Sequence, residues 1–218
     1  MNAITRTWFY LGGWLVLAVA VVVPFFCTHD RSASLKAALV RSDGTILKAF
    51  FTPYDNIKEM LIALINNEEQ SIDMMAYLLS DKHIVSALQE AAYVRHIAVT
   101  IIVDHDNAIN VKYNRTLKKL ANYVTLRIFQ ELNDGIMHNK FVIFSKNVDQ
   151  KPLVWTGSFN FTARAQHGNI ENALVSNDPE LVAQYQKTFK ALHSFSTPCE
   201  QVFNAPSVHA IKPTLAIA

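Results

Sequence analysis

The chain has 218 residues, half of them hydrophobic, a length that suits one α/β domain with a sizeable core better than two domains. Its formal net charge of +2 and its pI near 8.5 exclude the strongly basic composition that by itself identifies a nucleic-acid-binding domain. Its two cysteines, Cys27 and Cys199, lack the paired spacing of a structural zinc site and can form at most one bridge, which excludes a zinc module and a disulfide scaffold.

The first feature along the chain is an apolar run near the N-terminus. No charged residue lies between Thr7 and Thr28, and the almost wholly apolar stretch 8–26 is long enough to cross a bilayer as a helix. Aromatic residues stand at both ends of the run, as they do at the two interfaces of a membrane. We therefore predict membrane attachment through residues 8–27, with residues 1–34 forming a transmembrane anchor and its linker.

A cleaved secretory signal is the competing interpretation of this segment. Arg6 would be its basic residue, and the small residues 32–34 its cleavage site. The apolar run exceeds a usual signal core, which favours the retained anchor. Three basic residues follow the span closely and one precedes it, so the positive-inside rule favours a cytoplasmic catalytic part, whereas cleavage would export the protein to the periplasm or the medium. Both alternatives stay open at this stage.

Beyond the linker, apolar blocks alternate with helical patterns, which is typical of β-α-β units. Strands are predicted at residues 46–51, 71–79, 98–103 and 124–129. One helix begins at Asp55, and a second is capped by Asp81. Their apolar faces comprise Ile57, Met60, Leu61, Leu64 and Ile65 in the first helix and Ile84, Val85, Leu88, Ala91 and Ala92 in the second. The pattern predicts a mixed, mostly parallel sheet flanked by helices in a domain of residues 35–199.

The later part of that domain adds two helices. The first carries Lys112, Arg115, Lys118 and Lys119, which form either a solvated helix face or a surface that steers phosphate groups. The second begins at Asp178-Pro179, because aspartate is a good N-cap and proline suits the first turn. Its apolar positions are Leu181, Val182, Tyr185, Phe189 and Leu192. Residues 200–218 lack periodicity and are predicted to form a C-terminal tail.

The segment most informative about chemistry is Ile136 to Phe144, which follows an Asn-Asp-Gly turn signal. On a strand, alternate side chains point to the same face, so His138 and Lys140 would lie on one side, roughly 6.6 Å apart along the backbone. An imidazole and an ammonium group would then face a common point. Asp104, at the end of an apolar strand, is assigned to helix capping or a turn, with lining of the site mouth as the alternative.

A second polar segment follows shortly downstream. Gly157 permits close approach of the backbone, and Ser158 and Asn160 offer neutral hydrogen-bond donors. A helix beginning near Asn160 would add backbone N–H groups suited to an anion. Glu171 lies in the Asn-Ile-Glu-Asn segment that comes next. Together these groups are the components of a phosphate-binding site.

The two segments resemble the HxK and GSxN motifs of the phospholipase D superfamily, and the order of elements over residues 46–192 is similar to that of its small, single-motif members. Those members include bacterial endonucleases and mitochondrial-surface phospholipase D-like nucleases. The resemblance implies that His138 is the nucleophile and that Lys140, Ser158 and Asn160 hold the phosphate. It also implies that Glu171 orients the histidine.

The sequence departs from the family pattern at one position. The pattern is HxKxxxxD, and Ser145 occupies the place of the aspartate. Asp149 lies four residues further along and is not assigned to this role. Because the family aspartate is generally regarded as supporting the fold around the site, its loss bears on rate or stability more than on the type of reaction.

The residues predict a reaction that needs no metal and no cofactor. Lys140 would neutralise the nonbridging oxygens of a phosphodiester, and a neutral His138 would form a phosphohistidine, which divides one difficult displacement into two easier ones. The leaving oxygen requires a proton, for which a second histidine is the natural donor. Since the chain contains a single HxK, we expect a two-fold homodimer to supply it.

Three hypotheses for the function follow. The first is a nuclease that cleaves DNA or RNA, the second a phospholipase D that hydrolyses membrane phospholipids. The third is a weakly active, membrane-tethered module that binds phosphate-bearing partners.

Overall fold

The computed structural model of the protein describes residues 32–130 and 135–204 and divides the chain into two compact units, residues 1–38 and 39–218. The described part of the first unit is helical. The predicted membrane segment, residues 8–27, lies outside the described residues. In the two described ranges, no helix combines the length and apolar character needed to cross a bilayer.

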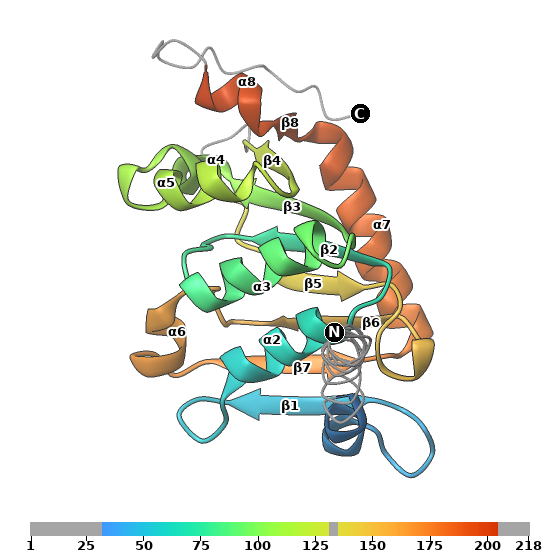
Figure 1. Cartoon of the computed structure of the whole chain (residues 1–218). Coiled ribbons are helices and arrows are strands. Elements are labelled where there is room, and N and C mark those ends of the chain that lie inside the picture. The colour runs from blue at the N-terminus through green and yellow to red at the C-terminus, as the bar shows by residue number, and fades with distance from the viewer. Residues whose placement is uncertain (1–31, 131–134, 205–218) are drawn as a thin grey trace, which may run out of the picture. The chain divides into compact units, whose positions relative to one another are not determined.

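The described part of the second unit contains one eight-stranded sheet with the order β1-β7-β6-β5-β2-β3-β4-β8 (Figure 1). The strands are β1 (Leu47–Phe51), β2 (Ser71–Ala76), β3 (Ala98–Asp104), β4 (Thr125–Phe129), β5 (Lys140–Phe144), β6 (Leu153–Gly157), β7 (Asn172–Ser176) and β8 (Thr197–Pro198). β5 lies near the middle of the sheet, paired with β2 on one side and β6 on the other.

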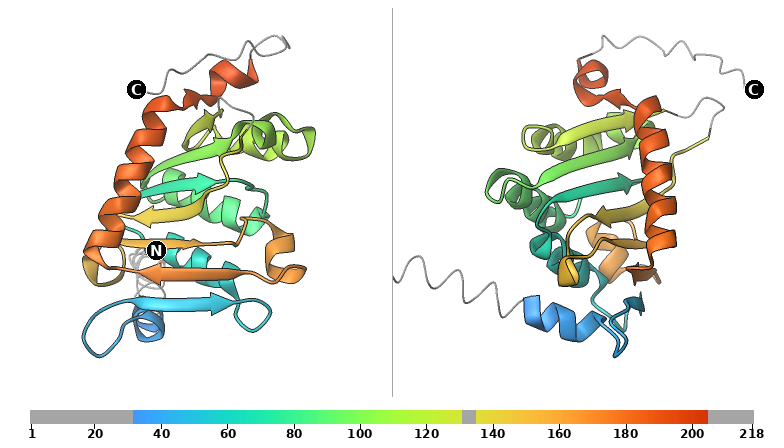
Figure 2. Two further views of the ribbon diagram at one scale, coloured as in Figure 1. Left: turned by 180° about the vertical axis from the view of Figure 1, so that it is seen from behind. Right: turned by 90° about the vertical axis from the view of Figure 1, so that its right-hand side faces the viewer.

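Helices cover both faces of this sheet. They are α2 (Ile57–Asn67), α3 (Lys82–Tyr93), α4 (His105–Ile109), α5 (Val111–Leu120), α6 (Ala163–His167), α7 (Pro179–Phe195) and α8 (Cys199–Phe203), with a 3-10 turn at Val148–Gln150. α2 and α3 pack side by side on one face, and the long helix α7 crosses the other (Figure 2).

The predicted helix starts are largely confirmed. The Asp81 carboxylate accepts hydrogen bonds from two backbone N–H groups in the first turn of α3. The Asp178 carboxylate does the same for one N–H group in α7, and Pro179 is the first residue of that helix. The first helix differs slightly, because its cap is Asn56 rather than Asp55. The Asp55 carboxylate instead accepts a hydrogen bond from the Phe51 N–H at 2.8 Å, so it is engaged in the preceding turn.

The prediction of a mostly parallel sheet is wrong. Only the pairs β2–β3 and β3–β4 among the described strands are parallel, and the other five pairs are antiparallel. Parallel neighbours require a crossover connection, which α3 and the α4–α5 pair provide. Between β5, β6 and β7 the chain makes shorter connections without crossing over, and this gives an antiparallel meander.

The pairings gather several chain segments at one edge of the sheet. Ala76 pairs with Lys140, and Gly157 pairs with Ala173, so the ends of β2 and β6 meet the starts of β5 and β7. Residues at this edge, which we call the site edge, are Phe51, Ala76, Asp104, Lys140, Gly157 and Asn172. Segments distant in the sequence are therefore adjacent here.

The C-terminal part differs from the prediction at its start. Residues 200–203, expected to lack regular structure, belong to the short helix α8, and residues 205–218 lie outside the described part. Cys199 at the start of α8 is a buried free thiol, and burial raises its pKa to about 11.

Removing a side chain from the core between α7 and the sheet should lower the stability of the protein measurably. Phe189 is 5% exposed and belongs to the cluster that joins α7 to strands β2 to β6. Phe189→Ala should lower the free energy of unfolding by about 3–5 kcal/mol, because it removes a buried aromatic side chain and leaves a cavity. Phe195→Ala on the same helix is the matched control, since Phe195 is 66% exposed. Equal losses for the two variants in urea denaturation would contradict this packing.

Candidate active site

His138 and Lys140 lie at the site edge, where β5 begins. Lys140 is the first residue of the strand and is buried, whereas His138 lies two residues before it and is exposed. The predicted strand therefore starts later than expected. The β2–β5 pairing nevertheless extends toward His138, because the Tyr77 N–H donates a hydrogen bond to the Asn139 carbonyl at 3.0 Å.

Tyr77, which directly follows β2, brings the two predicted catalytic side chains together. Its ring centroid lies 4.5 Å from that of His138 in an edge-to-face arrangement. The Lys140 ammonium lies 5.0 Å from the same Tyr77 centroid and donates a hydrogen bond of 2.6 Å to the His138 carbonyl oxygen. An ammonium group has three donors, and with one of them bound to His138 the described residues leave two for a phosphate.

The surroundings adjust the charge of both groups. Desolvation, followed by the nearby positive charge of Lys140, lowers the pKa of His138 below 6.5, while the Asp104 carboxylate opposes this shift. A lowered pKa favours the neutral imidazole, which is the nucleophilic form. Burial also lowers the pKa of Lys140 from 10.5, and the negative charge of Glu171 acts in the opposite direction.

Glu171 belongs to a hydrogen-bonded cluster immediately before β7. One carboxylate oxygen accepts a hydrogen bond from the Ser158 hydroxyl at 2.5 Å, and the other accepts one from the Asn169 amide at 2.8 Å. The Thr52 hydroxyl accepts from the Glu171 N–H at 2.8 Å, which fixes the backbone next to the end of β1. The contacts described for the carboxylate are thus Ser158 and Asn169, and its role in orienting His138 stays a prediction.

The Gly-Ser-Phe-Asn segment leaves β6 close to this cluster. A Cβ atom at Gly157 would lie 2.2 Å from the Asn172 carbonyl oxygen, so only glycine permits this approach. Ser158 also accepts a hydrogen bond from the Asn172 N–H at 3.0 Å. The Asn160 side-chain oxygen is buried and has no hydrogen-bond partner within the described residues.

The helix predicted near Asn160 begins later. It is the five-residue helix α6, capped by the Thr162 side chain, so its N–H groups do not start at the predicted position. The N–H of Thr162 instead donates to the Asn160 carbonyl at 2.7 Å. The reason is local, because a threonine N-cap competes effectively with a helix start at the preceding residues.

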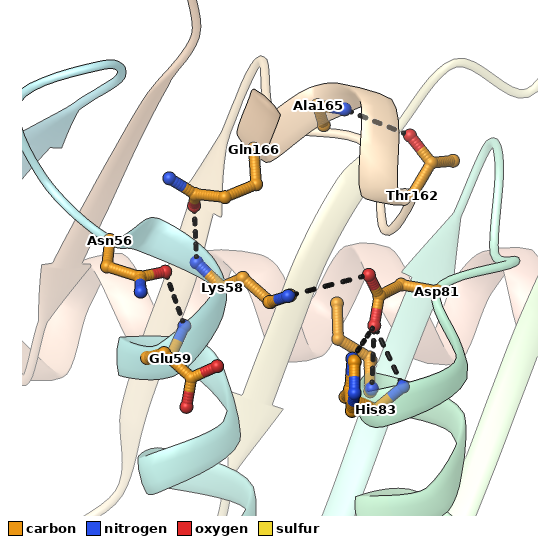
Figure 3. A network of polar contacts seen from close by, with 9 residues as sticks. Asn56, Lys58, Glu59, Asp81, His83, Thr162, Ala165 and Gln166 are labelled. Atoms are coloured by element: carbon orange, nitrogen blue, oxygen red, sulfur yellow. Dashed lines mark hydrogen bonds and ion pairs between the residues drawn. The ribbon is translucent and has the colours of Figure 1, made fainter. Parts of the chain in front are cut away.

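A network of polar contacts holds α6 against α2 and α3 (Figure 3). The Gln166 side chain accepts a hydrogen bond from the Lys58 N–H at 3.0 Å, and the Lys58 ammonium lies 4.0 Å from the Asp81 carboxylate. Both charged side chains are buried. The Phe161 carbonyl accepts from the Asp81 N–H at 3.0 Å. The loop that carries Ser158 and Asn160 is therefore anchored to the amino ends of two helices.

Asp104 has a role that the sequence only partly indicated. Its carboxylate caps α4, as expected, through a 3.2 Å hydrogen bond from the Asn107 N–H. The second carboxylate oxygen accepts from the Met137 N–H at 3.0 Å, directly before His138. The sequence did not predict this contact or that of Tyr77. Strands β2 and β3 are far from residue 138 along the chain, and no local pattern shows that they lie beside it in the sheet.

Ser145, at the position of the motif aspartate, lies at the other end of β5. Its hydroxyl is 2.5 Å from the Ser71 hydroxyl. A buried carboxylate, that of Glu68, nevertheless lies at this end of the strand. It accepts hydrogen bonds from the N–H groups of Ser71 and Lys146 at 3.0 and 2.8 Å. Glu68 also accepts from the Asn147 amide at 3.1 Å. Glu68 thus joins the start of β2 to the end of β5.

The fold and the site define an α/β protein with an imidazole, an ammonium and a hydroxyl–amide pair at one sheet edge. No group of three His, Cys, Asp or Glu side chains in the described ranges has the geometry to hold a metal ion. A family model described as "Cardiolipin synthase, PLD-like domain" matches residues 61–193, which is more than half of the chain. The chain therefore belongs to the phospholipase D-like family.

Individual relatives agree with this assignment. A phospholipase D from Rickettsia conorii is 35% identical over 137 residues, which make up 62% of this chain and 63% of that protein. The human mitochondrial cardiolipin hydrolase is 28% identical over 137 residues, 62% of this chain and 50% of that protein. The match thus spans less than two thirds of the length of either relative.

Solved structures show the same fold. Nuc from Salmonella typhimurium, a phospholipase D family member, is 27% identical with a TM-score of 0.63, and the match covers 71% of this chain and 97% of that one. NucT from Helicobacter pylori has a TM-score of 0.64 at 22% identity, covering 71% of this chain and 99% of that one, and shares the fold.

The position of Glu68 predicts that restoring the motif aspartate does not stabilise the protein. Ser145→Asp should lower the free energy of unfolding by about 1–3 kcal/mol, because a second carboxylate would lie near Glu68. Glu68→Gln should lower it by about 1.5–3 kcal/mol, since its amide nitrogen would face the donor of Asn147. Chemical denaturation of each variant measures both effects.

The double variant Glu68→Gln with Ser145→Asp tests the coupling. It should lose less stability than the sum of the two single variants, because the repulsion is removed and the carboxylate introduced by Ser145→Asp can accept from backbone N–H groups in place of Glu68. Additive losses, or a stabilising effect of Ser145→Asp alone, would contradict the structural role given to Glu68.

Proposed function

We propose that the protein is a metal-independent phosphodiester hydrolase in which His138 is the nucleophile and a homodimer forms the complete site. The observation that carries the proposal is the arrangement at the start of β5. An exposed imidazole with a lowered pKa lies beside the buried ammonium of Lys140, and the Ser158–Glu171 cluster is close enough for the charge of Glu171 to act on Lys140.

In the first step, a ring nitrogen of His138 attacks phosphorus and the ester bond to the leaving oxygen breaks. Lys140 and the side-chain N–H group of Asn160 hold the nonbridging oxygens, and Ser158 joins them when its single O–H turns from Glu171 to the phosphate, so that charge on the phosphoryl group is neutralised as the geometry changes. The leaving oxygen takes a proton from the partner subunit's His138. The product of this step is a phosphohistidine together with a free alcohol.

In the second step, water attacks the phosphorus of the phosphohistidine. The partner subunit's His138, now neutral, takes a proton from this water, and the bond between phosphorus and the first imidazole breaks. A phosphomonoester is released and both histidines return to their starting states. The single HxK of the chain supports the dimer, because one chain supplies either the nucleophile or the acid but not both.

Nucleic acid is the substrate class that we propose. The support is the resemblance to the small, single-motif endonucleases, together with four exposed basic residues on α5. These residues are Lys112, Arg115, Lys118 and Lys119. Positive side chains on one helix attract a phosphate backbone.

A phospholipid head group is the second candidate. The observation that favours it is the naming of the relatives from Rickettsia conorii and from human as phospholipase D and cardiolipin hydrolase. If the apolar segment 8–27 is retained as an anchor, it would hold the site near such a substrate. If it is a cleaved signal, it would do so only until export.

A side-by-side assay in EDTA tests the reaction and separates the substrates. The full-length protein should cleave single-stranded DNA or RNA without added metal, and His138→Ala should abolish cleavage and phosphohistidine formation while leaving the dimer intact. Turnover of phosphatidylcholine or cardiolipin vesicles without nucleic-acid cleavage at low salt would favour the second candidate. Strict dependence on magnesium or zinc, or full activity of His138→Ala, would contradict the mechanism.

The charges around His138 predict the pH dependence. The productive dimer has one neutral and one protonated imidazole, and this state is most populated near the lowered pKa of the pair. We expect kcat/KM to be highest below pH 6.5, the ordinary pKa of histidine, and to fall as rising pH removes the remaining proton. Asp104→Asn should move the maximum to still lower pH, because the Asp104 carboxylate raises the pKa of His138. A maximum above pH 7.5, or an alkaline shift in Asp104→Asn, would contradict this account.

A further inference from the structure

Tyr77 is the one described side chain whose ring contacts both members of the HxK pair. Its distance of 5.0 Å to the Lys140 ammonium lies within the range of a cation–π interaction, roughly 6 Å. Its ring centroid is 4.5 Å from that of His138, with 65° between the ring planes, an edge-to-face geometry that aromatic pairs prefer. Tyr77 is distant in the sequence from both residues, so the sheet itself makes these contacts.

A backbone hydrogen bond joins Tyr77 to the segment that carries the two catalytic side chains. The Tyr77 N–H donates to the carbonyl of Asn139, the residue between His138 and Lys140. Strand β2 is itself held from both sides, by β3 and by β5. The backbone that carries the Tyr77 ring is therefore tied directly to the HxK segment.

The two contacts act on different requirements of the reaction. The imidazole of His138 is exposed, and the edge-to-face packing restricts its rotation about the side-chain bonds. The ammonium of Lys140 is buried, and the negative face of an aromatic ring offsets part of the cost of keeping a charge there. One side chain thus limits the orientation of the nucleophile and the position of the phosphate-binding cation.

We propose that Tyr77 is a positioning residue of this active site, whose ring holds the His138 imidazole in the attacking orientation and the Lys140 ammonium beside the phosphate. The inference rests on the proposed function and extends it to a residue outside the HxK and GSxN motifs. Both contacts are made by the ring, so the aromatic face and not the hydroxyl group carries the effect.

The decisive comparison is between Tyr77→Phe and Tyr77→Leu in the full-length protein, with bis(4-nitrophenyl) phosphate as the substrate. Tyr77→Phe keeps the ring and should retain kcat within about threefold. Tyr77→Leu should lower kcat by about a hundredfold, more than it raises KM, because small displacements of reacting groups cost on this order. A leucine variant within threefold of the wild type, or a phenylalanine variant as impaired as leucine, overturns the proposal.

Tyr185→Leu is the matched control. Tyr185 also packs edge-to-face against a residue of β5, with its ring centroid 4.9 Å from that of Phe141, but it lies on α7 and contacts neither His138 nor Lys140 in the described structure. It should lower the melting temperature while leaving kcat unchanged. A loss of kcat equal to that of Tyr77→Leu would show that loosening β5 is sufficient, and would overturn the specific role of Tyr77.

Nuclear magnetic resonance of the His138 ring gives a readout that needs no substrate. The ring current of Tyr77 should displace the His138 proton signals in the wild type and in Tyr77→Phe, and Tyr77→Leu should remove the displacement. If the wild type cleaves no phosphodiester, the proposed function fails while this measurement still tests the contact. Unchanged His138 signals in Tyr77→Leu overturn the proposal.

If Tyr77→Leu does not fold, variants with fluorinated phenylalanine at position 77 test the proposal instead. Added fluorine atoms weaken the negative face of the ring with little change in its shape. Under the proposal kcat/KM falls with each added fluorine, and a constant kcat/KM across the series overturns it.

Discussion

Strand β5 pairs with β2 through Ala76 and Lys140, and the candidate site depends on this contact. The antiparallel pairing places the end of β2 beside the start of β5, so that Tyr77 meets His138 and Lys140. It also leaves the other side of β5 to β6, whose end carries the Gly-Ser-Phe-Asn segment. A one-residue shift of β5 would turn Lys140 to the opposite face of the sheet and separate these groups.

The buried ammonium of Lys140 shows how the site is prepared for an anion. Burial of a positive charge is unfavourable unless neighbouring groups compensate for it. Here the carbonyl oxygen of His138, the face of Tyr77 and the charge of Glu171 share this role. None of them uses all the donors of the ammonium, so a phosphate can complete its coordination and neutralise the charge.

The residues of the HxKxxxxD pattern lie at opposite ends of β5. His138 and Lys140 lie at the site edge. Ser145 follows the far end of the strand, roughly 17 Å from Lys140 along the backbone. At that far end the carboxylate of Glu68 binds backbone N–H groups of both β2 and β5. Glu68 therefore joins the two strands at this end in the absence of the motif aspartate.

The sequence by itself determined most of the elements and the chemical groups. Hydrophobic periodicity and the caps Asp81 and Asp178 are local signals, and they located the starts of α3 and α7 correctly. The HxK and GSxN motifs predicted His138, Lys140, Ser158 and Asn160 as site residues from short segments, and the structure brings Lys140 and Glu171 within electrostatic reach of each other.

Only the tertiary structure decided the sheet order and what surrounds the motifs. The antiparallel insertion of β5 between β2 and β6 was not predicted, because strand pairing joins residues that are far apart along the chain and leaves no local pattern. For the same reason the contacts of Tyr77 with His138, of Asp104 with Met137 and of Glu68 with Lys146 could not be read from the sequence. Local propensity specifies which residues form a strand, but packing of distant segments decides which strands become neighbours.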